Sequence, residues 1–382
     1  MDKEAIQIFF EFLSNKELSL SNLDEKIYSW SPNSLLEFSE DCQELLPTTT
    51  KKASSIFDFT ANSQLSGSPS PCAAMDCRMQ NVDAMARFAT LYADRILLRN
   101  PFEDYHRINQ FDDDSYEKIV NDLRIIYQLK PLLEAGLVDF VESPSPKSHF
   151  CLECYEKIIF SQPKYFGERL SETKNKLRDK YIKEAIFYIE NIDGTKFVIK
   201  ENKSESIDDG SCAYIIEGLS EPLERRLRSS DRIKLSKKDI FSLNILDYYA
   251  VDILDDIAIQ NWCSNIYKTS YLTNRRIDLE LISDSPIQET YNKALIESFS
   301  HYLPLIYDTT LSKLIKLRKE EGEAFLVYRD ALAQALKTAS HSNYNDLNQI
   351  FNDIVQPEIN KINNAVKKRN NYCVTHYLVT LL

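Results

Sequence analysis

Glycine is scarce in this chain, which has seven glycines among 382 residues. Neither the G-x-x-x-x-G-K-[S/T] pattern of phosphate-binding loops nor the G-x-G-x-x-G pattern of dinucleotide-binding folds occurs. The chain also lacks the G-x-S-x-G, H-E-x-x-H, kinase catalytic-loop and EF-hand patterns. These absences argue against several large classes of enzyme.

Long hydrophobic runs are missing as well. No apolar stretch approaches the roughly 18 residues that a membrane-spanning helix needs, and the charged opening Met1-Asp2-Lys3-Glu4 is unlike a signal peptide. We therefore expect a cytoplasmic protein with no membrane partner. The net charge of -12 argues against non-specific binding to nucleic acid, because such binding depends on neutralising phosphates. This net charge does not exclude a local basic groove.

The composition is that of a globular protein, with 43% hydrophobic and 27% charged residues, and the length suggests two or three domains. We predict an α+β fold that is predominantly helical and ends in a helical C-terminal region. The predicted domains are an N-terminal helical segment (1–60), a cysteine-containing α/β domain (61–182), a β-hairpin region with a basic segment (183–236) and a helical C-terminal domain (237–382).

A strand, a helix and a second strand follow one another in the α/β domain. Asp94–Phe102 predicts a short buried strand, and Leu137–Val141 predicts another. Between them, apolar periodicity predicts a helix that begins with Ser115 as its N-cap, is disturbed in its last turn by Pro131 and ends at Gly136. The short joins favour a right-handed βαβ crossover with parallel strands. A winged-helix unit is the alternative, because a helix followed by a strand also suits that module.

A β-hairpin is predicted in the next domain. Ile186–Glu190 and Lys196–Ile199 have the composition of strands, and Asp193-Gly194 between them suits a tight turn because both residues tolerate positive φ. Ala213–Ile216 is expected to form another strand. From Lys237 onward the sequence is mostly helical in character.

Two closely spaced cysteine pairs suggest a metal site. Cys72 and Cys77 form one pair, and Cys151 and Cys154 form a C-x-x-C motif. Structural zinc prefers four thiolate or imidazole ligands in a tetrahedron, so the two pairs can supply a complete site, with His149 as a substitute for either member of the first pair. The alternatives are reduced, buried cysteines that act as small hydrophobic residues, or a redox-active pair.

The segment after the first predicted strand combines an acid, a base and two cations. Arg99, Asp104, His106 and Arg107 are the mixture that a phosphoryl or nucleotide site uses. In open α/β sheets ligands collect at the carboxyl ends of the strands, where this segment is expected to lie. A surface loop with solvated charges is the alternative.

A dense basic segment runs from Arg225 to Lys238, with Asp231 as its single acid. It can bind nucleic acid or the acidic surface of a partner, or be a solvated charge run. Its basic residues are Arg225, Arg226, Arg228, Arg232, Lys234, Lys237 and Lys238.

Three carboxylates follow the basic segment, at Asp252, Asp255 and Asp256. They share one face of a predicted helix because their spacing is i, i+3 and i+4. The spacing suits Mg²⁺ ligands, or a stripe that faces water on the side opposite the apolar residues.

The pattern Arg369-Asn370…His376 resembles the R-x(4–6)-H motif of HEPN ribonucleases, and Arg99-Asn100…His106 matches it too. Pro101 prevents a regular helix in the second case. The resemblance covers only about the last 40 residues. It implies a metal-independent ribonuclease in which Arg369 and His376 project from one helix toward a dimer partner and assist attack of the RNA 2′-hydroxyl.

A second resemblance rests on Leu91–Phe102 and Pro131–Val138, which look like uncharacterised bacterial proteins of mobile or defence-type loci. It implies a role in an anti-phage or toxin-type system. We therefore weigh two functions. The first is a sensor or scaffold component that binds a ligand, a protein partner or a second copy of itself. The other is the HEPN-like ribonuclease effector.

Overall fold

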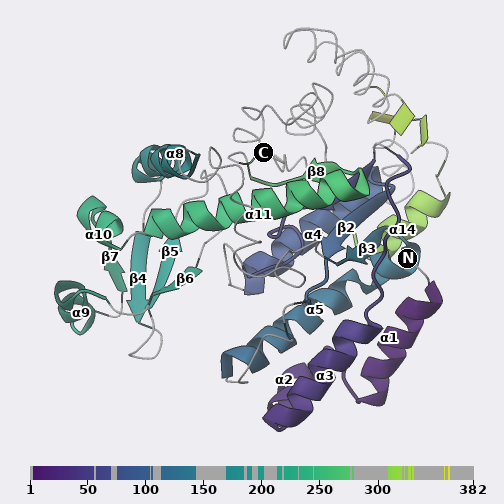
Figure 1. Ribbon diagram of the computed structural model, residues 1–382, viewed down its shortest axis with the longest axis horizontal. Coiled ribbons are helices and arrows are strands. Elements are labelled where there is room, and N and C mark those ends of the chain that lie inside the picture. Colours follow the sequence, from purple (N-terminus) through teal and green to yellow (C-terminus); the bar gives the residue numbers. More distant parts are fainter. Residues whose placement is uncertain are drawn as a thin grey trace.

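The computed structural model of the chain contains two β-sheets linked by one long helix (Figure 1). The structure describes residues 3–55, 57–69, 75–103, 105, 113–142, 169–184, 187–191, 197–201, 213–216, 219–230, 232–243, 245–275, 278, 309–320, 322, 326–327, 329–330, 357 and 360–361. Helix is the predominant secondary structure, as predicted.

The first sheet has four parallel strands in the order β3-β2-β1-β8. They are β1 (Asp58–Ala61), β2 (Arg95–Arg99), β3 (Val138–Val141) and β8 (Ser270–Leu272). Because β2 and β3 are parallel and joined by a helix, the predicted βαβ crossover is confirmed and the winged-helix alternative is wrong. The parallel sheet makes the class α/β rather than α+β.

The crossover helix α5 (Asp113–Ala135) is longer than the sequence suggested. It includes Ser115, so the predicted N-cap is wrong, and it continues through Pro131. Its end is as predicted: Gly136 has a φ of +72°, and the N–H groups of Gly136 and Leu137 donate to carbonyls of the last turn. This left-handed residue turns the chain directly into β3.

Helices cover both faces of the parallel sheet. Ile96 and Leu98 belong to the core that α4 (Met75–Tyr92) and α5 share, whereas Leu97 contacts α11 (Ile245–Tyr267) from the opposite face. Both faces are therefore buried, as is usual for parallel strands. The three N-terminal helices and α14 also contribute to the α4–α5 side. These are α1 (Lys3–Asn15), α2 (Leu23–Tyr28), α3 (Pro32–Leu45) and α14 (Leu311–Glu320).

The second sheet is antiparallel, in the order β6-β5-β4-β7. Its strands are β4 (Phe187–Asn191), β5 (Phe197–Glu201), β6 (Ala213–Ile216) and β7 (Arg232–Lys234). The predicted hairpin is confirmed by the pairing of β4 with β5, and the predicted third strand by β6. Three helices surround this sheet, namely α8 (Arg169–Glu184), α9 (Glu221–Leu227) and α10 (Lys237–Ser242).

Helix α11 belongs to both units (Figure 1). Residues such as Leu246 and Ile253 lie in the core of the antiparallel unit, and Cys263 and Tyr267 pack on the parallel sheet. None of the described helices is both long and apolar enough to cross a membrane. The predicted domain boundaries stay a prediction, because the two cores alone do not define them.

Candidate functional site

The order of the parallel strands creates a point at which the chain changes direction. From β1 the chain crosses through α4 to β2 on one side, whereas β8 joins β1 on the other side and follows α11 on the opposite face. In open α/β sheets, ligands bind at the carboxyl ends of the strands near such a switch point. The residues that follow β1 and β8 are therefore in the position where a ligand site is expected.

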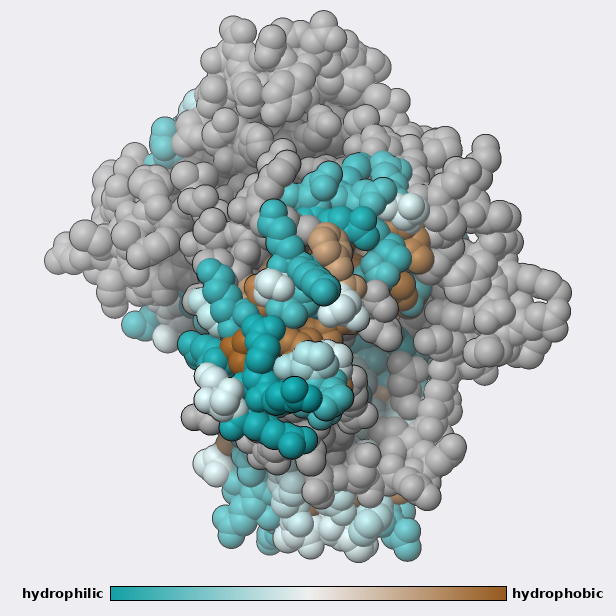
Figure 2. Space-filling model, turned by 90° about the vertical axis from the view of Figure 1, so that its left-hand side faces the viewer, coloured by the Kyte–Doolittle hydropathy of each residue, from teal (hydrophilic) through white to brown (hydrophobic). Residues whose placement is uncertain are grey.

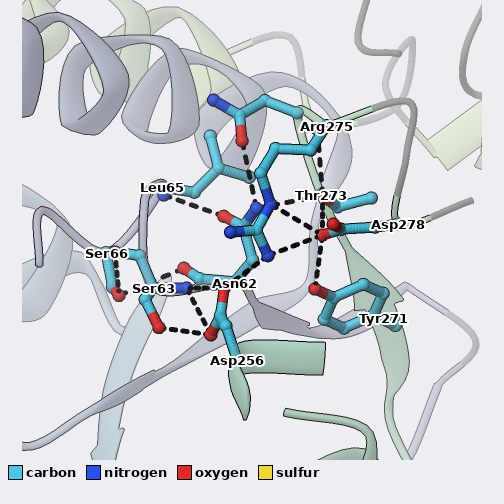
Figure 3. Close-up of polar contacts among 10 residues, drawn as sticks. Asn62, Ser63, Leu65, Ser66, Asp256, Tyr271, Thr273, Arg275 and Asp278 are labelled. Carbon is cyan, nitrogen blue, oxygen red and sulfur yellow. Dashed lines mark hydrogen bonds and ion pairs between the residues drawn. The ribbon is translucent and has the colours of Figure 1, made fainter. Parts of the chain in front are cut away.

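A buried arginine organises this switch point (Figure 3). Arg275 is 1% exposed, and its Nη2 donates to Asp256 at 2.5 Å and to Asp278 at 2.8 Å. Tyr271 and Thr273 donate their hydroxyls to the same oxygen of Asp278 at 2.8 and 2.7 Å. The network ties the end of β8 to the middle of α11.

Burial shapes the ionisation of this network. Burial alone would lower the pKa of Arg275, but Asp278 and Asp256 raise it well above its ordinary value. Burial raises the pKa of Asp278 against the opposing effect of Arg275. The second oxygen of Asp278 is buried without a hydrogen-bond partner among the described residues. Arg275 therefore keeps its positive charge, and both Asp256 and Asp278 are bound to it.

The turn after β1 is tied to the same network. The backbone N–H and the hydroxyl of Ser63 both donate to Asp256. Asn62 donates to Thr273 at 2.9 Å and to Asn274 at 3.0 Å, and its side-chain oxygen accepts from the N–H of the residue three positions on. These contacts span about two hundred residues of sequence and fix the path of the turn.

A pocket of about 200 Å³ opens between this turn, the end of β2 and helix α5. It lies at the carboxyl edge of the parallel sheet, beside the switch point. Its lining is Ser63, Ser66, Gly67, Ser68, Pro69, Arg99, Asn100, Pro101, Lys118, Asp122, Ile125, Ile126 and Phe140. We call this space the sheet-edge pocket and residues 62–69 the serine turn.

Two cations line the pocket. Lys118 donates to Asp122 at 3.1 Å and lies 3.7 Å from the centre of the Tyr105 ring. Asp122 also accepts from the buried Arg78 at 2.7 Å and from the hydroxyl of Tyr105 at 2.8 Å. Burial, reinforced by Asp122, raises the pKa of Tyr105 well above its ordinary value, so its hydroxyl stays a donor. The second cation, Arg99, donates to Glu103 at 2.9 Å.

Gly67 allows the serine turn to lie this close to the helices. Its φ is +81°, and a Cβ at this position would lie 2.8 Å from Val82 and 2.9 Å from Ile125. Its carbonyl accepts from the Nε of Arg78 at 2.6 Å. A side chain at residue 67 would therefore push the turn away from α4 and α5.

The structure describes one of the four residues predicted to bind a nucleotide or phosphate. Arg99 ends β2 and lines the sheet-edge pocket, so its predicted position at the carboxyl edge of a sheet is confirmed. Asp104, His106 and Arg107 lie outside the described residues.

The predicted zinc ligands are mostly outside the described residues: Cys72, Cys151 and Cys154, as well as the substitute His149. Cys77 is half-buried in the first turn of α4 and packs against the core of the antiparallel unit. Across the part of the chain that the structure describes, no three or more His, Cys, Asp and Glu side chains form a group that could hold a metal ion. The four-cysteine site stays a prediction, as does the ribonuclease pair Arg369 and His376, which also lies outside the described residues.

The basic segment lies on the antiparallel unit, and the coloured part of the face in Figure 2, which views the molecule from this side, is mostly hydrophilic with hydrophobic patches between. Folding brings acids to three of its arginines. Arg225 pairs with Glu221 at 2.6 Å, and Arg226 pairs with Asp239 at 3.1 Å. Arg228 lies 3.8 Å from Glu224. Partner binding by this segment stays a prediction. Because three of its arginines are close to acids, the segment has less net positive charge to attract an acidic partner than its sequence suggested.

The three aspartates of α11 do not form the water-facing stripe that was one of the two predictions for them. Asp252 and Asp255 are half-buried, but Asp256 is buried and bound to Arg275, so it does not face water. A sequence signal for this was present. Asp256, Gln260 and Ser264 recur every four residues along α11, and all three are buried. A polar stripe on a helix of this kind marks a buried polar contact.

No protein-family model, no curated protein and no solved structure matches the chain. The chemistry of the site therefore rests on its geometry alone.

Proposed function

We propose that this protein binds a small phosphate-bearing molecule in the sheet-edge pocket and acts as a ligand-binding sensor component. The position of the pocket is the observation that carries this proposal. It lies at the carboxyl ends of three parallel strands, where open α/β sheets bind their ligands, and two cations line it.

The charges around the pocket support an anionic ligand. Asp122 is the acid among the lining residues that the structure describes, and Arg78 binds its carboxylate from inside the protein. Arg99 is paired with Glu103, so Lys118 leaves this group of three cations and two acids with one net positive charge. Charge-assisted hydrogen bonds from such groups to phosphate oxygens are about twice as strong as neutral ones. The volume of about 200 Å³ favours a compact ligand, since pockets for drug-sized molecules occupy about 300–1,000 Å³.

Helix α5 provides a matched pair of lysines for a test. Lys118 and Lys130 are 36% and 41% exposed, each is near an acid four residues on, and each lies over an aromatic ring. Only Lys118 lines the pocket. We expect Lys118→Met to weaken the binding of glycerol 3-phosphate about tenfold or more in isothermal titration calorimetry, because a charged hydrogen bond is lost.

Lys130→Met is the control, and it should bind glycerol 3-phosphate as the unchanged protein does. Equal weakening by both variants would show that the effect is one of general surface charge. If the unchanged protein binds neither glycerol 3-phosphate nor inorganic phosphate, the proposed function is wrong.

A sensor of this kind fits the predicted membership of a bacterial anti-phage or toxin-type system, which forms part of the same proposal. Ligand binding at the sheet edge requires neither the zinc site nor a ribonuclease centre. The HEPN-like alternative at Arg369 and His376 stays a prediction of the sequence.

A further inference from the structure

The serine turn resembles a phosphate-binding loop only in composition, because most of its backbone donors are already used. The N–H of Ser63 donates to Asp256, and the N–H of Leu65 donates to the side chain of Asn62. The N–H groups of residues 66, 67 and 68 donate to carbonyls within the turn, at 2.9 to 3.1 Å. A phosphate cradle needs N–H groups that point at the ligand. The turn therefore does not provide one.

The hydroxyls of Ser63 and Ser66 are committed in the same way. Ser63 donates its proton to Asp256, a carboxylate that can only accept. Ser66 lies 3.1 Å from the carbonyl oxygen of Asn62 and 2.9 Å from that of Ser63, and these oxygens also only accept. Both hydroxyls must act as donors toward the protein. Each then offers the pocket only its lone pairs, so this wall accepts hydrogen bonds.

The lining residues from the end of β2 and from α5 form a second wall with the complementary chemistry. The side-chain oxygen of Asn100 accepts from the N–H of Phe102 at 2.9 Å, so its amide nitrogen is the group that can donate to a ligand. Lys118 has three N–H donors, of which Asp122 takes one. The guanidinium of Arg99, whose Nε donates to Glu103, also belongs to this donor wall.

We infer that the ligand is a phosphorylated polyol, such as a sugar phosphate. Its hydroxyls donate to Ser63 and Ser66, and its phosphate accepts from Lys118, Arg99 and Asn100. This inference rests on the proposed function and assigns the two ends of the ligand to the two walls. A phosphate without alcohol hydroxyls, such as n-pentyl phosphate, would satisfy only the donor wall.

The Arg275 network explains how the acceptor wall keeps its orientation. Arg275 holds the carboxylate of Asp256, and Asp256 holds both the N–H and the hydroxyl of Ser63. Arg275 and Asp256 do not line the pocket. They are positioning residues for the serine turn. Because the Ser63 proton is directed at Asp256, its oxygen presents lone pairs to the ligand.

Two phosphates of equal carbon number separate this inference from the proposed function. Ribose 5-phosphate has hydroxyls that can donate, and n-pentyl phosphate has none. We expect the unchanged protein to bind ribose 5-phosphate at least about tenfold more tightly than n-pentyl phosphate in calorimetry, since two further hydrogen bonds form. Ser66→Ala should reduce this ratio of affinities about two- to tenfold and leave the affinity for n-pentyl phosphate unchanged. Ser63→Ala should act in the same way.

Each outcome decides a different point. If both phosphates bind equally, or if Ser66→Ala weakens both to the same degree, the polyol inference is wrong while phosphate binding stands. If neither phosphate binds, or if unphosphorylated ribose binds as tightly as ribose 5-phosphate, the proposed function itself is wrong. Should Ser63→Ala fail to fold because Asp256 loses a donor, Ser66→Ala still decides the question, since the Ser66 hydroxyl donates to carbonyls of its own turn and not to a carboxylate among the described residues.

Discussion

The two sheets of this protein bury their strands in different ways. In the parallel sheet, every residue of β1 and β3 is buried, and helices cover both faces. In the antiparallel sheet, burial alternates along β7, where Ile233 is buried between the exposed Arg232 and Lys234. The first unit places charges inside the fold, and the second places them at its surface.

The buried network around Arg275 and the exposed basic segment therefore differ in what they can do. Polar groups enclosed by the parallel sheet must satisfy one another, so they form a fixed network around Arg275. Charges on the antiparallel unit are solvated, and their ion pairs lie at the surface. A buried network can orient a ligand, whereas an exposed basic segment mainly influences long-range attraction. We therefore place the ligand site in the first unit.

The largest effect should come from removing a buried arginine. Arg275 and Arg225 bind a carboxylate at 2.5 and 2.6 Å, but their side chains are 1% and 77% exposed. Arg275→Met leaves two buried acids without their counter-charge and should lower the free energy of unfolding by about 3–5 kcal/mol. Arg225→Met should lower it by less than about 0.5 kcal/mol. Urea denaturation measures both values, and similar losses would contradict the contrast between the two units.

A smaller difference should separate two glycines of the parallel unit. Gly67 and Gly136 both have positive φ, but only at Gly67 would a Cβ meet other atoms within 3 Å. Gly67→Ala should cost about 2–4 kcal/mol, from the backbone conformation and from overpacking against α4 and α5. Gly136→Ala should cost about 1–2 kcal/mol, from the backbone conformation alone. Equal losses in urea denaturation would show that the close approach of the serine turn does not constrain residue 67.

The smallest effect concerns whether the two cores unfold together. Ile96 lies in the parallel-sheet core and Ile189 in the antiparallel-sheet core, and both are fully buried. Ile96→Val and Ile189→Val should each cost about 1 kcal/mol. Because α11 contributes to both units, we expect a single unfolding transition that both variants shift alike. Two transitions by circular dichroism, with each variant moving only one, would show that the units fold independently.

Local patterns were read correctly where the interaction partners are close in sequence. The β4–β5 hairpin follows from two strand-like runs around Asp193-Gly194, and the crossover follows from strand, helix and strand with short joins. Strands β1 and β8 were missed. They have four and three residues, and β1 contains the polar residues Asp58 and Thr60. Segments this short carry little periodicity of their own.

The helical majority, the crossover, the hairpin and the position of Arg99 at the end of a strand were predictable, because each depends on neighbours within about forty residues. The switch point, the sheet-edge pocket and the roles of Ser63, Asp256 and Arg275 were not, because they depend on long-range contacts. Thr60 contacts Thr269 at a separation of 209 residues, and Ser63 contacts Asp256 at 193. Contacts at such separations arise only when burial of both sheet faces brings β1, α11 and β8 together.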